Sequence, residues 1–194
     1  MHKNSEELFK KYALNLFKPN MKILEVGPDR QVYNKRNIDN NIGINNYSYY
    51  YTDIHKEYIN KLVVNHWNMA STYVDSPELP HFIPMVGDVS IGCEDNTFDI
   101  VYACNVIEHV SLPWVWLAEL KRITKPNGHV VVICPGITTP YHREPIDCWR
   151  IWPDGFVSLF KYIDLECEFT VSEHIVPEND GYKHLDTIAI GRKK

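Results

Sequence analysis

The chain has 194 residues, 44% hydrophobic and 23% charged, a composition typical of one globular α/β domain with a sizeable core. Its formal net charge of -5 leaves no broad basic face for a nucleic-acid backbone, and the basic run at residues 191–194 is typical of a solvated tail. Because the first residues form no apolar leader and no apolar run approaches membrane-spanning length, we expect a single cytoplasmic domain over residues 1–194, without a membrane or nucleic-acid partner.

The first half of the chain predicts one helix and three strands. Apolar residues at helical spacing indicate a helix over residues 5–17, with Ser5 as its N-cap and Pro19 near its end. Three apolar stretches then predict strands over residues 21–27, 49–52 and 80–87.

The second half alternates strands and helices and ends in a hairpin. Strands are predicted over 98–104 and 129–134, and helices over 112–124 and 153–162. The last two strand candidates, 165–175 and 184–192, are joined by turn residues at 177–181, so we expect them to pair antiparallel. The whole pattern predicts an α/β, Rossmann-like fold: a mostly parallel seven-stranded sheet with helices on both faces and an antiparallel C-terminal strand.

Acidic residues follow the first three predicted strands. Glu25 lies at the end of the first strand, Asp53 follows the second and Asp88 follows the third. Ligands of open α/β sheets bind beyond the carboxyl ends of the strands, and this acidic set favours a cationic ligand with sugar hydroxyls over one with phosphates. Each residue also has a structural interpretation: Asp53 as a helix cap, Asp88 as a loop residue bonded to amides, and Glu25 as a brace for its loop.

Six segments, in chain order, resemble the class I S-adenosylmethionine-dependent methyltransferases, and specifically the small type-11-like group. The segments are residues 23–28, 51–54, 87–89, 95–101, 106–110 and 120–129. The resemblance implies S-adenosylmethionine as the cofactor, with the ribose on Asp53 and the adenine on Asp88. The implied cofactor-binding residues are Glu25, Gly27, Pro28, Asp53, Ile54, Asp88, Val89 and Asn105.

The first loop departs from the family pattern, because Gly27 is followed by Pro28 and Asp29 where a further glycine is usual. Fewer glycines hold the backbone further from a ligand, so we expect a weakened or reshaped methionine end of the cofactor site. The loop leaves open a second function, a non-catalytic module that binds S-adenosylmethionine. It also argues against a dinucleotide dehydrogenase, which needs a G-x-G-x-x-G loop.

The loop after the fifth strand, residues 135–153, is the predicted acceptor side. It resembles the His-x-x-Pro-x-Asp-x-x-Arg segment of relatives that modify sugars or other small molecules, with His142, Asp147 and Arg150 at the matching positions. The structural alternative is that Asp147 and Arg150 form an ion pair while tryptophans cover the cleft. If the reaction needs a general base, the candidates are His142, Asp147 and His109.

The expected reaction is methyl transfer to an oxygen or nitrogen of a small molecule, with a sugar or related metabolite as one candidate acceptor. A nucleic-acid acceptor is disfavoured because residues 105–108 read Asn-Val-Ile-Glu and not Asn-Pro-Pro-Tyr. We expect no metal: the five cysteines form no Cys-x-x-Cys pair, and His142 with Asp147 is too small a ligand set. Cys104 and Cys134 stand in apolar runs and are predicted to be core residues.

Overall fold

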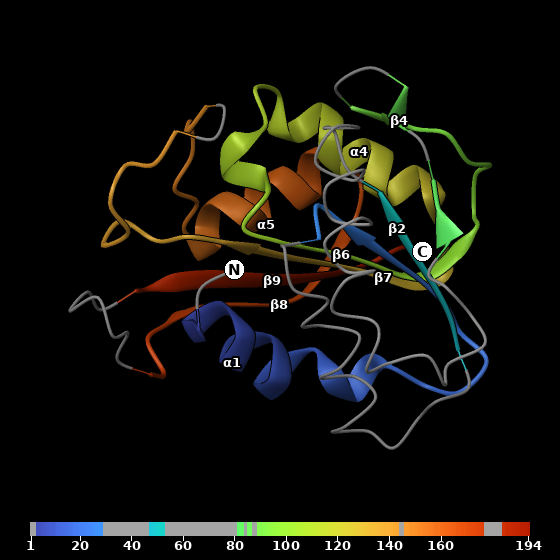
Figure 1. Cartoon of the computed structure of the whole chain (residues 1–194), viewed down its shortest axis with the longest axis horizontal. Helices are drawn as coiled ribbons and strands as arrows, with labels where there is room; N and C mark the ends of the chain where they lie inside the picture. The colour runs from blue at the N-terminus through green and yellow to red at the C-terminus, as the bar shows by residue number, and fades with distance from the viewer. Residues whose placement is uncertain are drawn as a thin grey trace, which may run out of the picture.

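A seven-stranded sheet forms the centre of the computed structural model, which describes residues 3–28, 47–52, 81–83, 85–86, 89–143, 146–176 and 184–194 (Figure 1). The strand order is β3-β2-β1-β6-β7-β9-β8. The strands are β1 (Lys22–Val26), β2 (Ser48–Thr52), β3 (His81–Phe82), β6 (Phe98–Cys104), β7 (Thr124–Cys134), β8 (Glu166–Glu173) and β9 (Asp186–Arg192).

One strand of this sheet is reversed. Parallel pairing joins β3, β2, β1, β6 and β7, whereas β9 pairs antiparallel with both β7 and β8. The predicted seven-stranded, mostly parallel sheet with an antiparallel C-terminal strand is therefore confirmed. Because β1, β2, β6 and β7 are parallel, their last residues meet along one side of the sheet, which we call the carboxyl edge.

Helices cover both faces of the sheet, as predicted (Figure 1). Helix α1 (Lys3–Tyr12) and the short 3-10 helix η1 (Leu14–Leu16) lie on one face, and α4 (Pro113–Ile123) and α5 (Pro153–Tyr162) lie on the other. Adjacent residues of β1 alternate between the two cores: Ile23 joins Phe9 of α1, and Leu24 joins Trp116 of α4. This two-residue period buries both faces of the strand, which explains its continuous apolar sequence.

The start of the chain differs from its prediction. The expected helix over 5–17 divides into α1 and η1, and Ser5 is not an N-cap, because α1 already begins at Lys3. The buried Ser5 hydroxyl donates to Asp186 Oδ2 at 2.8 Å, and the Asn4 amide donates to the same oxygen at 3.1 Å. A carboxylate on β9 is a stronger acceptor than a helix end, so these side chains fasten α1 to the sheet.

The single strand expected over 80–87 is also wrong. β3 pairs with β2, whereas β4 (Met85–Val86) pairs antiparallel with β5 (Ser90–Ile91) in a separate two-stranded sheet. Pro84 stands between β3 and β4 in the sequence, and a proline has no N–H for a strand ladder. β7 begins earlier than the expected residue 129, with an irregularity opposite residues 98–100 of β6.

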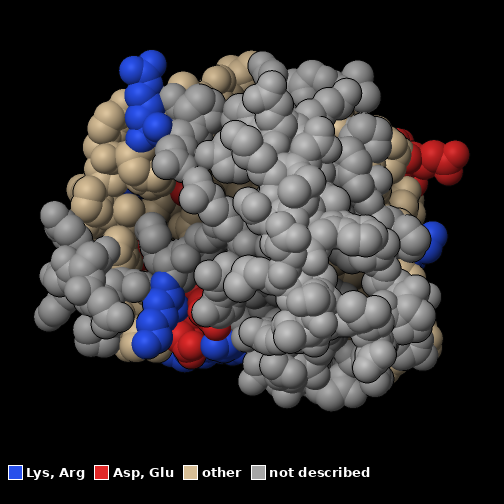
Figure 2. All heavy atoms as spheres, in the orientation of Figure 1, with Lys and Arg blue, Asp and Glu red and all other residues tan. Residues whose placement is uncertain are grey.

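The remaining predictions concern charge, membranes and cysteines. On the face shown in Figure 2, Lys and Arg side chains appear at the upper left, the right edge and the lower left, where they stand beside Asp or Glu. Within the described ranges, no helix combines the length and the apolarity that crossing a membrane requires. All five cysteines are described, none forms a disulfide, and Cys104 and Cys134 are buried as expected. The predicted turn at 177–181 lies outside the described residues.

Candidate functional site

The loop after β1 runs close to the segment after β6. Gly27 has φ +66°, and a Cβ built on it would lie 2.5 Å from Val106 Cγ2. Its N–H donates to the Thr52 carbonyl at the end of β2, at 2.8 Å. Both the left-handed backbone and the close approach to Val106 require glycine at position 27.

Glu25 is fixed by neighbouring tyrosines at the carboxyl edge. Its buried carboxylate accepts a hydrogen bond from Tyr49 of β2, whose hydroxyl lies 3.1 Å from that of Tyr102 of β6. Burial, together with the Glu25 charge, raises the pKa of Tyr102 well above its usual range. Glu25 thus links three adjacent strands, and its contact with a cofactor stays a prediction.

Polar atoms without partners collect at the same edge. Asn105 directly follows β6 with φ +54°, and its N–H donates to the Ile133 carbonyl of β7 at 2.9 Å. Neither its side-chain oxygen nor its nitrogen has a hydrogen-bond partner, and Thr52 Oγ1, at the end of β2, is also buried without one. Buried polar groups are normally satisfied, so this edge fits a ligand with hydroxyl, amino and carboxylate groups such as S-adenosylmethionine.

The other predicted cofactor residues are placed only in part. Val89 is half-buried and packs against the core next to β5. Asp53, Ile54 and Asp88 lie outside the described residues, so the ribose and adenine contacts stay predictions.

Directly after this edge, the 3-10 helix η3 (Ile107–His109) carries two further polar side chains. Glu108 is fully buried, and neither oxygen of its carboxylate accepts a hydrogen bond. Burial raises the pKa of Glu108 to about 8. The Nδ1 atom of His109 bonds to the Ile146 carbonyl, and its Nε2 lies 3.6 Å from Glu108 Oε1.

His142 reaches the same point from the loop that follows β7. Its Nδ1 lies 3.1 Å from the Pro140 carbonyl, and its Nε2 lies 3.9 Å from Glu108 Oε1. Its ring meets that of His109 edge to face, with centroids 5.0 Å apart. We call Glu108, His109 and His142 the Glu108 cluster: each offers one ligand atom, and these atoms lie within 4.8 Å of one another.

Asp147 organises the loop beneath His142. Its two oxygens accept from Arg150 Nη1 at 2.5 Å and Nη2 at 2.8 Å, and Oδ2 also accepts from the His142 N–H at 2.8 Å. The Arg150 hydrogen bonds lower the pKa of Asp147 to about 2. The ion pair suggested by the sequence is therefore present, and it shapes the loop that carries His142.

Two contacts fasten this loop to η3. The Cys148 N–H donates to the Glu108 carbonyl at 2.7 Å, and Trp149 Nε1 donates to the Val110 carbonyl at 2.7 Å. Trp149 is half-buried, whereas Tyr141 and Trp152 are exposed. The structure thus brings His109, His142 and Asp147 together, but Glu108, which the sequence analysis did not select, lies at the centre. Its only sequence signal is its place beside His109 after a buried strand.

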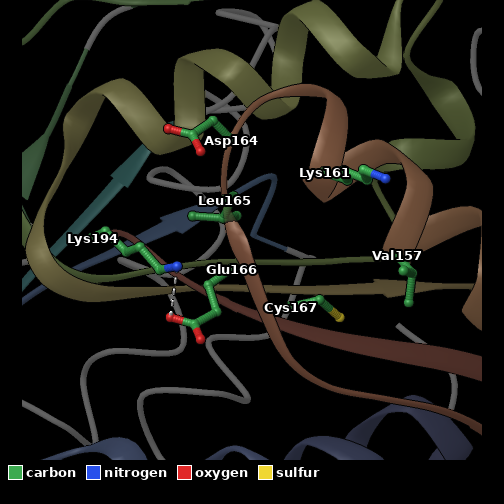
Figure 3. Close-up of a pocket in the computed structure, with 7 residues that line it drawn as sticks. All are labelled: Val157, Lys161, Asp164, Leu165, Glu166, Cys167 and Lys194. Atoms are coloured by element: carbon green, nitrogen blue, oxygen red, sulfur yellow. Dashed lines mark ion pairs between the residues drawn. The ribbon is translucent and has the colours of Figure 1, made fainter.

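A separate hollow of about 260 Å³ lies between α5 and the start of β8 (Figure 3). It is lined by Val157, Lys161, Asp164, Leu165, Glu166, Cys167 and Lys194. Glu166 begins β8, and Lys194 follows the reversed strand β9, so this hollow is at the opposite edge of the sheet from the Glu108 cluster. Its Lys194–Glu166 ion pair is a long one, at 4.0 Å.

Comparison with known proteins relates this chain to methyltransferases. Residues 40–132 match the family model described as a methyltransferase domain. A 36-residue stretch, 19% of this chain, is 56% identical to an uncharacterised methyltransferase of Schizosaccharomyces pombe, and it spans 13% of that protein.

Two solved structures share the fold. A SAM-dependent methyltransferase from Aquifex aeolicus has a TM-score of 0.64 at 18% identity, covering 98% of this chain and 90% of that one. A SAM-dependent methyltransferase from Methanosarcina mazei has a TM-score of 0.63 at 18% identity, covering 92% of this chain and 95% of that one. At these identities the likeness shows a common fold.

Proposed function

This chain belongs to the class I S-adenosylmethionine-dependent methyltransferases, and from that premise we propose that it methylates an oxygen or nitrogen of a small molecule, with sugars and related metabolites as the first class to test. S-adenosylmethionine supplies a methyl group activated by its sulfonium. The protein has to align donor and acceptor and to receive the acceptor's proton.

The observation that carries this proposal is the position of the Glu108 cluster directly after the carboxyl edge of the sheet. The unpartnered groups of Thr52 and Asn105 suit the donor, and the cluster follows them by three residues along the chain from Asn105. The acceptor is then held between this edge and the loop over residues 135–152. As the bond from the acceptor to the methyl carbon forms, the bond from sulfur to carbon breaks and the acceptor's proton leaves.

The two histidines are the groups best placed to take that proton. A carbonyl oxygen only accepts hydrogen bonds, so the Nδ1 atoms of His109 and His142 carry their hydrogens towards Ile146 and Pro140. In a neutral imidazole the other nitrogen, Nε2, is then an acceptor. Both Nε2 atoms lie towards Glu108, inside the proposed acceptor site.

Asp147 has a positioning role in this proposal. Arg150 occupies both of its oxygens, and a pKa of about 2 makes it a weak base at neutral pH. Its bond to the His142 N–H fixes the backbone of the residue that faces the acceptor. Asp147 thus acts through His142.

A small acceptor agrees with the charge and the loop. The net charge is -5, which disfavours a nucleic-acid backbone. Tyr141 and Trp152 offer exposed aromatic surface on the same loop, which suits the apolar face of a sugar or an aromatic metabolite.

The test is a methyl-transfer assay with isotopically labelled S-adenosylmethionine and a panel of hydroxylated sugars, phenols and amines. We expect His142→Ala to lower turnover about 100-fold or more while S-adenosylhomocysteine affinity stays unchanged. The matched control is His129→Ala, because His129 lies on β7, away from the cluster, where its side chain pairs with Glu168 of β8. Full turnover in His142→Ala contradicts the proposed acceptor site. Cofactor binding without transfer to any acceptor supports the non-catalytic alternative.

A further inference from the structure

The buried carboxylate of Glu108 faces the ring nitrogens of His109 and His142 at 3.6 and 3.9 Å, too far for a hydrogen bond to either. Its side chain is fully buried, and neither oxygen accepts a hydrogen bond. Leaving such a group unsatisfied costs folding free energy, so native proteins almost always pair it. Arg150, whose charge acts on Glu108, already donates to both oxygens of Asp147.

The two imidazoles beside Glu108 are oriented as metal ligands are. Each directs Nδ1 to a backbone carbonyl, and each has Nε2 near the same oxygen, Glu108 Oε1. A hydrogen bond from the other ring nitrogen to a carbonyl is the usual outer contact of a metal-bound histidine. The Oε1–Nε2 separations of 3.6 and 3.9 Å are slightly longer than the edge of a tetrahedron of ligands about zinc, roughly 3.3 Å for bonds of about 2.0–2.1 Å.

We propose that Glu108, His109 and His142 bind one divalent transition-metal ion, for which zinc is the reference. Two imidazoles and one carboxylate suit zinc and its neighbours, whereas magnesium prefers an all-oxygen set. Three protein ligands also leave a coordination position open, which is typical of catalytic zinc and not of structural zinc. This inference departs from the sequence-based expectation of no metal, which considered only His142 and Asp147.

The role of the ion rests on the function proposed above. An acceptor hydroxyl at the open position loses its proton more readily, because a bound cation lowers the pKa of a coordinated oxygen. The proton passes to solvent, the oxygen–methyl bond forms and the sulfur–methyl bond breaks, with no change in oxidation state. With the ion bound, the imidazoles serve as ligands, and the ion takes over the activation of the acceptor. An oxygen acceptor is then favoured over a nitrogen one.

Direct metal titration tests the site without reference to activity. The full chain is treated with EDTA, dialysed and titrated with Zn²⁺ by calorimetry, with Co²⁺ added separately as a spectroscopic probe. We expect stoichiometric Zn²⁺ binding and visible Co²⁺ absorption bands of a low-coordinate site. Glu108→Gln and His142→Ala should each weaken Zn²⁺ binding at least about tenfold. His129→Ala, the matched histidine control, should leave it unchanged. His142 lies on a partly exposed loop, so its variant tests the site even if Glu108→Gln does not fold.

The outcomes separate the metal from the methyl transfer. Absence of stoichiometric Zn²⁺ binding, tighter binding of Mg²⁺ than of Zn²⁺, or an equal loss in His129→Ala overturns the site. Zn²⁺ binding at the cluster without methyl transfer to any acceptor supports the site and contradicts the proposed function. Full turnover by the EDTA-treated protein, which still binds added Zn²⁺, overturns the role of the ion on the acceptor and leaves the methyl transfer intact.

Discussion

Gly27→Ala is the substitution for which the structure gives the most definite expectation. At φ +66° an alanine is strained by about 1–2 kcal/mol, and its Cβ would lie 2.5 Å from Val106 Cγ2, where ordinary contacts begin near 3.4 Å. Crowding of this kind typically costs a further 1–3 kcal/mol, roughly, whereas the stiffer unfolded chain returns about 0.4–1 kcal/mol. We expect the free energy of unfolding to fall by about 1–5 kcal/mol.

A second substitution isolates the contact. Val106→Ala removes Cγ1 and Cγ2 but keeps Cβ, which is 3.6 Å from the built Cβ of residue 27 and so in ordinary contact. In urea unfolding, the double variant should therefore be more stable than the two single effects predict, by about 1 kcal/mol or more. Gly155→Ala in α5 is the control glycine: its Cβ would meet only Ile151 Cγ2, at 3.0 Å.

The same variants are also tested for S-adenosylhomocysteine binding. A displaced loop after β1 should weaken S-adenosylhomocysteine binding at least about tenfold in Gly27→Ala, whereas Gly155→Ala should bind normally. If the effects of Gly27→Ala and Val106→Ala on the free energy of unfolding simply add in the double variant, the contact with Val106 is refuted. Unchanged stability together with unchanged affinity in Gly27→Ala would refute the need for glycine here.

Three further predictions concern the cofactor, the loop and the N-terminal helix. Asp53→Ala should weaken S-adenosylhomocysteine binding by at least about 1 kcal/mol, and equal affinities by calorimetry would exclude the ribose contact. Because Arg150 holds the pKa of Asp147 at about 2, the bridge stabilises the fold above about pH 4 and loses this effect as the pH falls towards 2. The stability difference between wild type and Asp147→Asn should shrink over that range in chemical unfolding, and a constant difference would contradict it. Ser5→Ala should destabilise the protein by about 1.5–3 kcal/mol through its bond to Asp186, whereas an unchanged urea midpoint would show that bond to be unimportant.

Most of the fold was predictable because local sequence patterns, such as apolar runs and turn residues, determine it. Short apolar runs bounded by turns marked β1, β6 and the core of β7, and Pro113 marked the first turn of α4. The errors occurred where tertiary contacts override local signals. Ser5 resembles a helix cap, but its hydroxyl bonds to Asp186, more than 180 residues away along the chain.

The site was predictable only in its separate pieces. Family resemblance selected His142 and Asp147, and the position after β6 selected His109, yet nothing local shows that η3 and the 140–150 loop meet. That meeting depends on the Cys148–Glu108 backbone bond and on the Trp149 indole, which are tertiary contacts. Glu108 matters because its side chain is completely buried. The sequence around it, with a valine and an isoleucine just before it, does not tell whether a glutamate there is buried or exposed.

The insertion of β9 between β7 and β8 sets an order of events for folding. β8 emerges from the ribosome before β9 and has no neighbour in the sheet until β9 arrives, while β7 meanwhile presents an open edge. Such edges pair readily with other chains, so the nascent protein is most vulnerable to aggregation during this interval. The sheet is therefore completed only when residues 186–192 pair as β9. A chain that stalls before them leaves the facing edges of β7 and β8 unpaired.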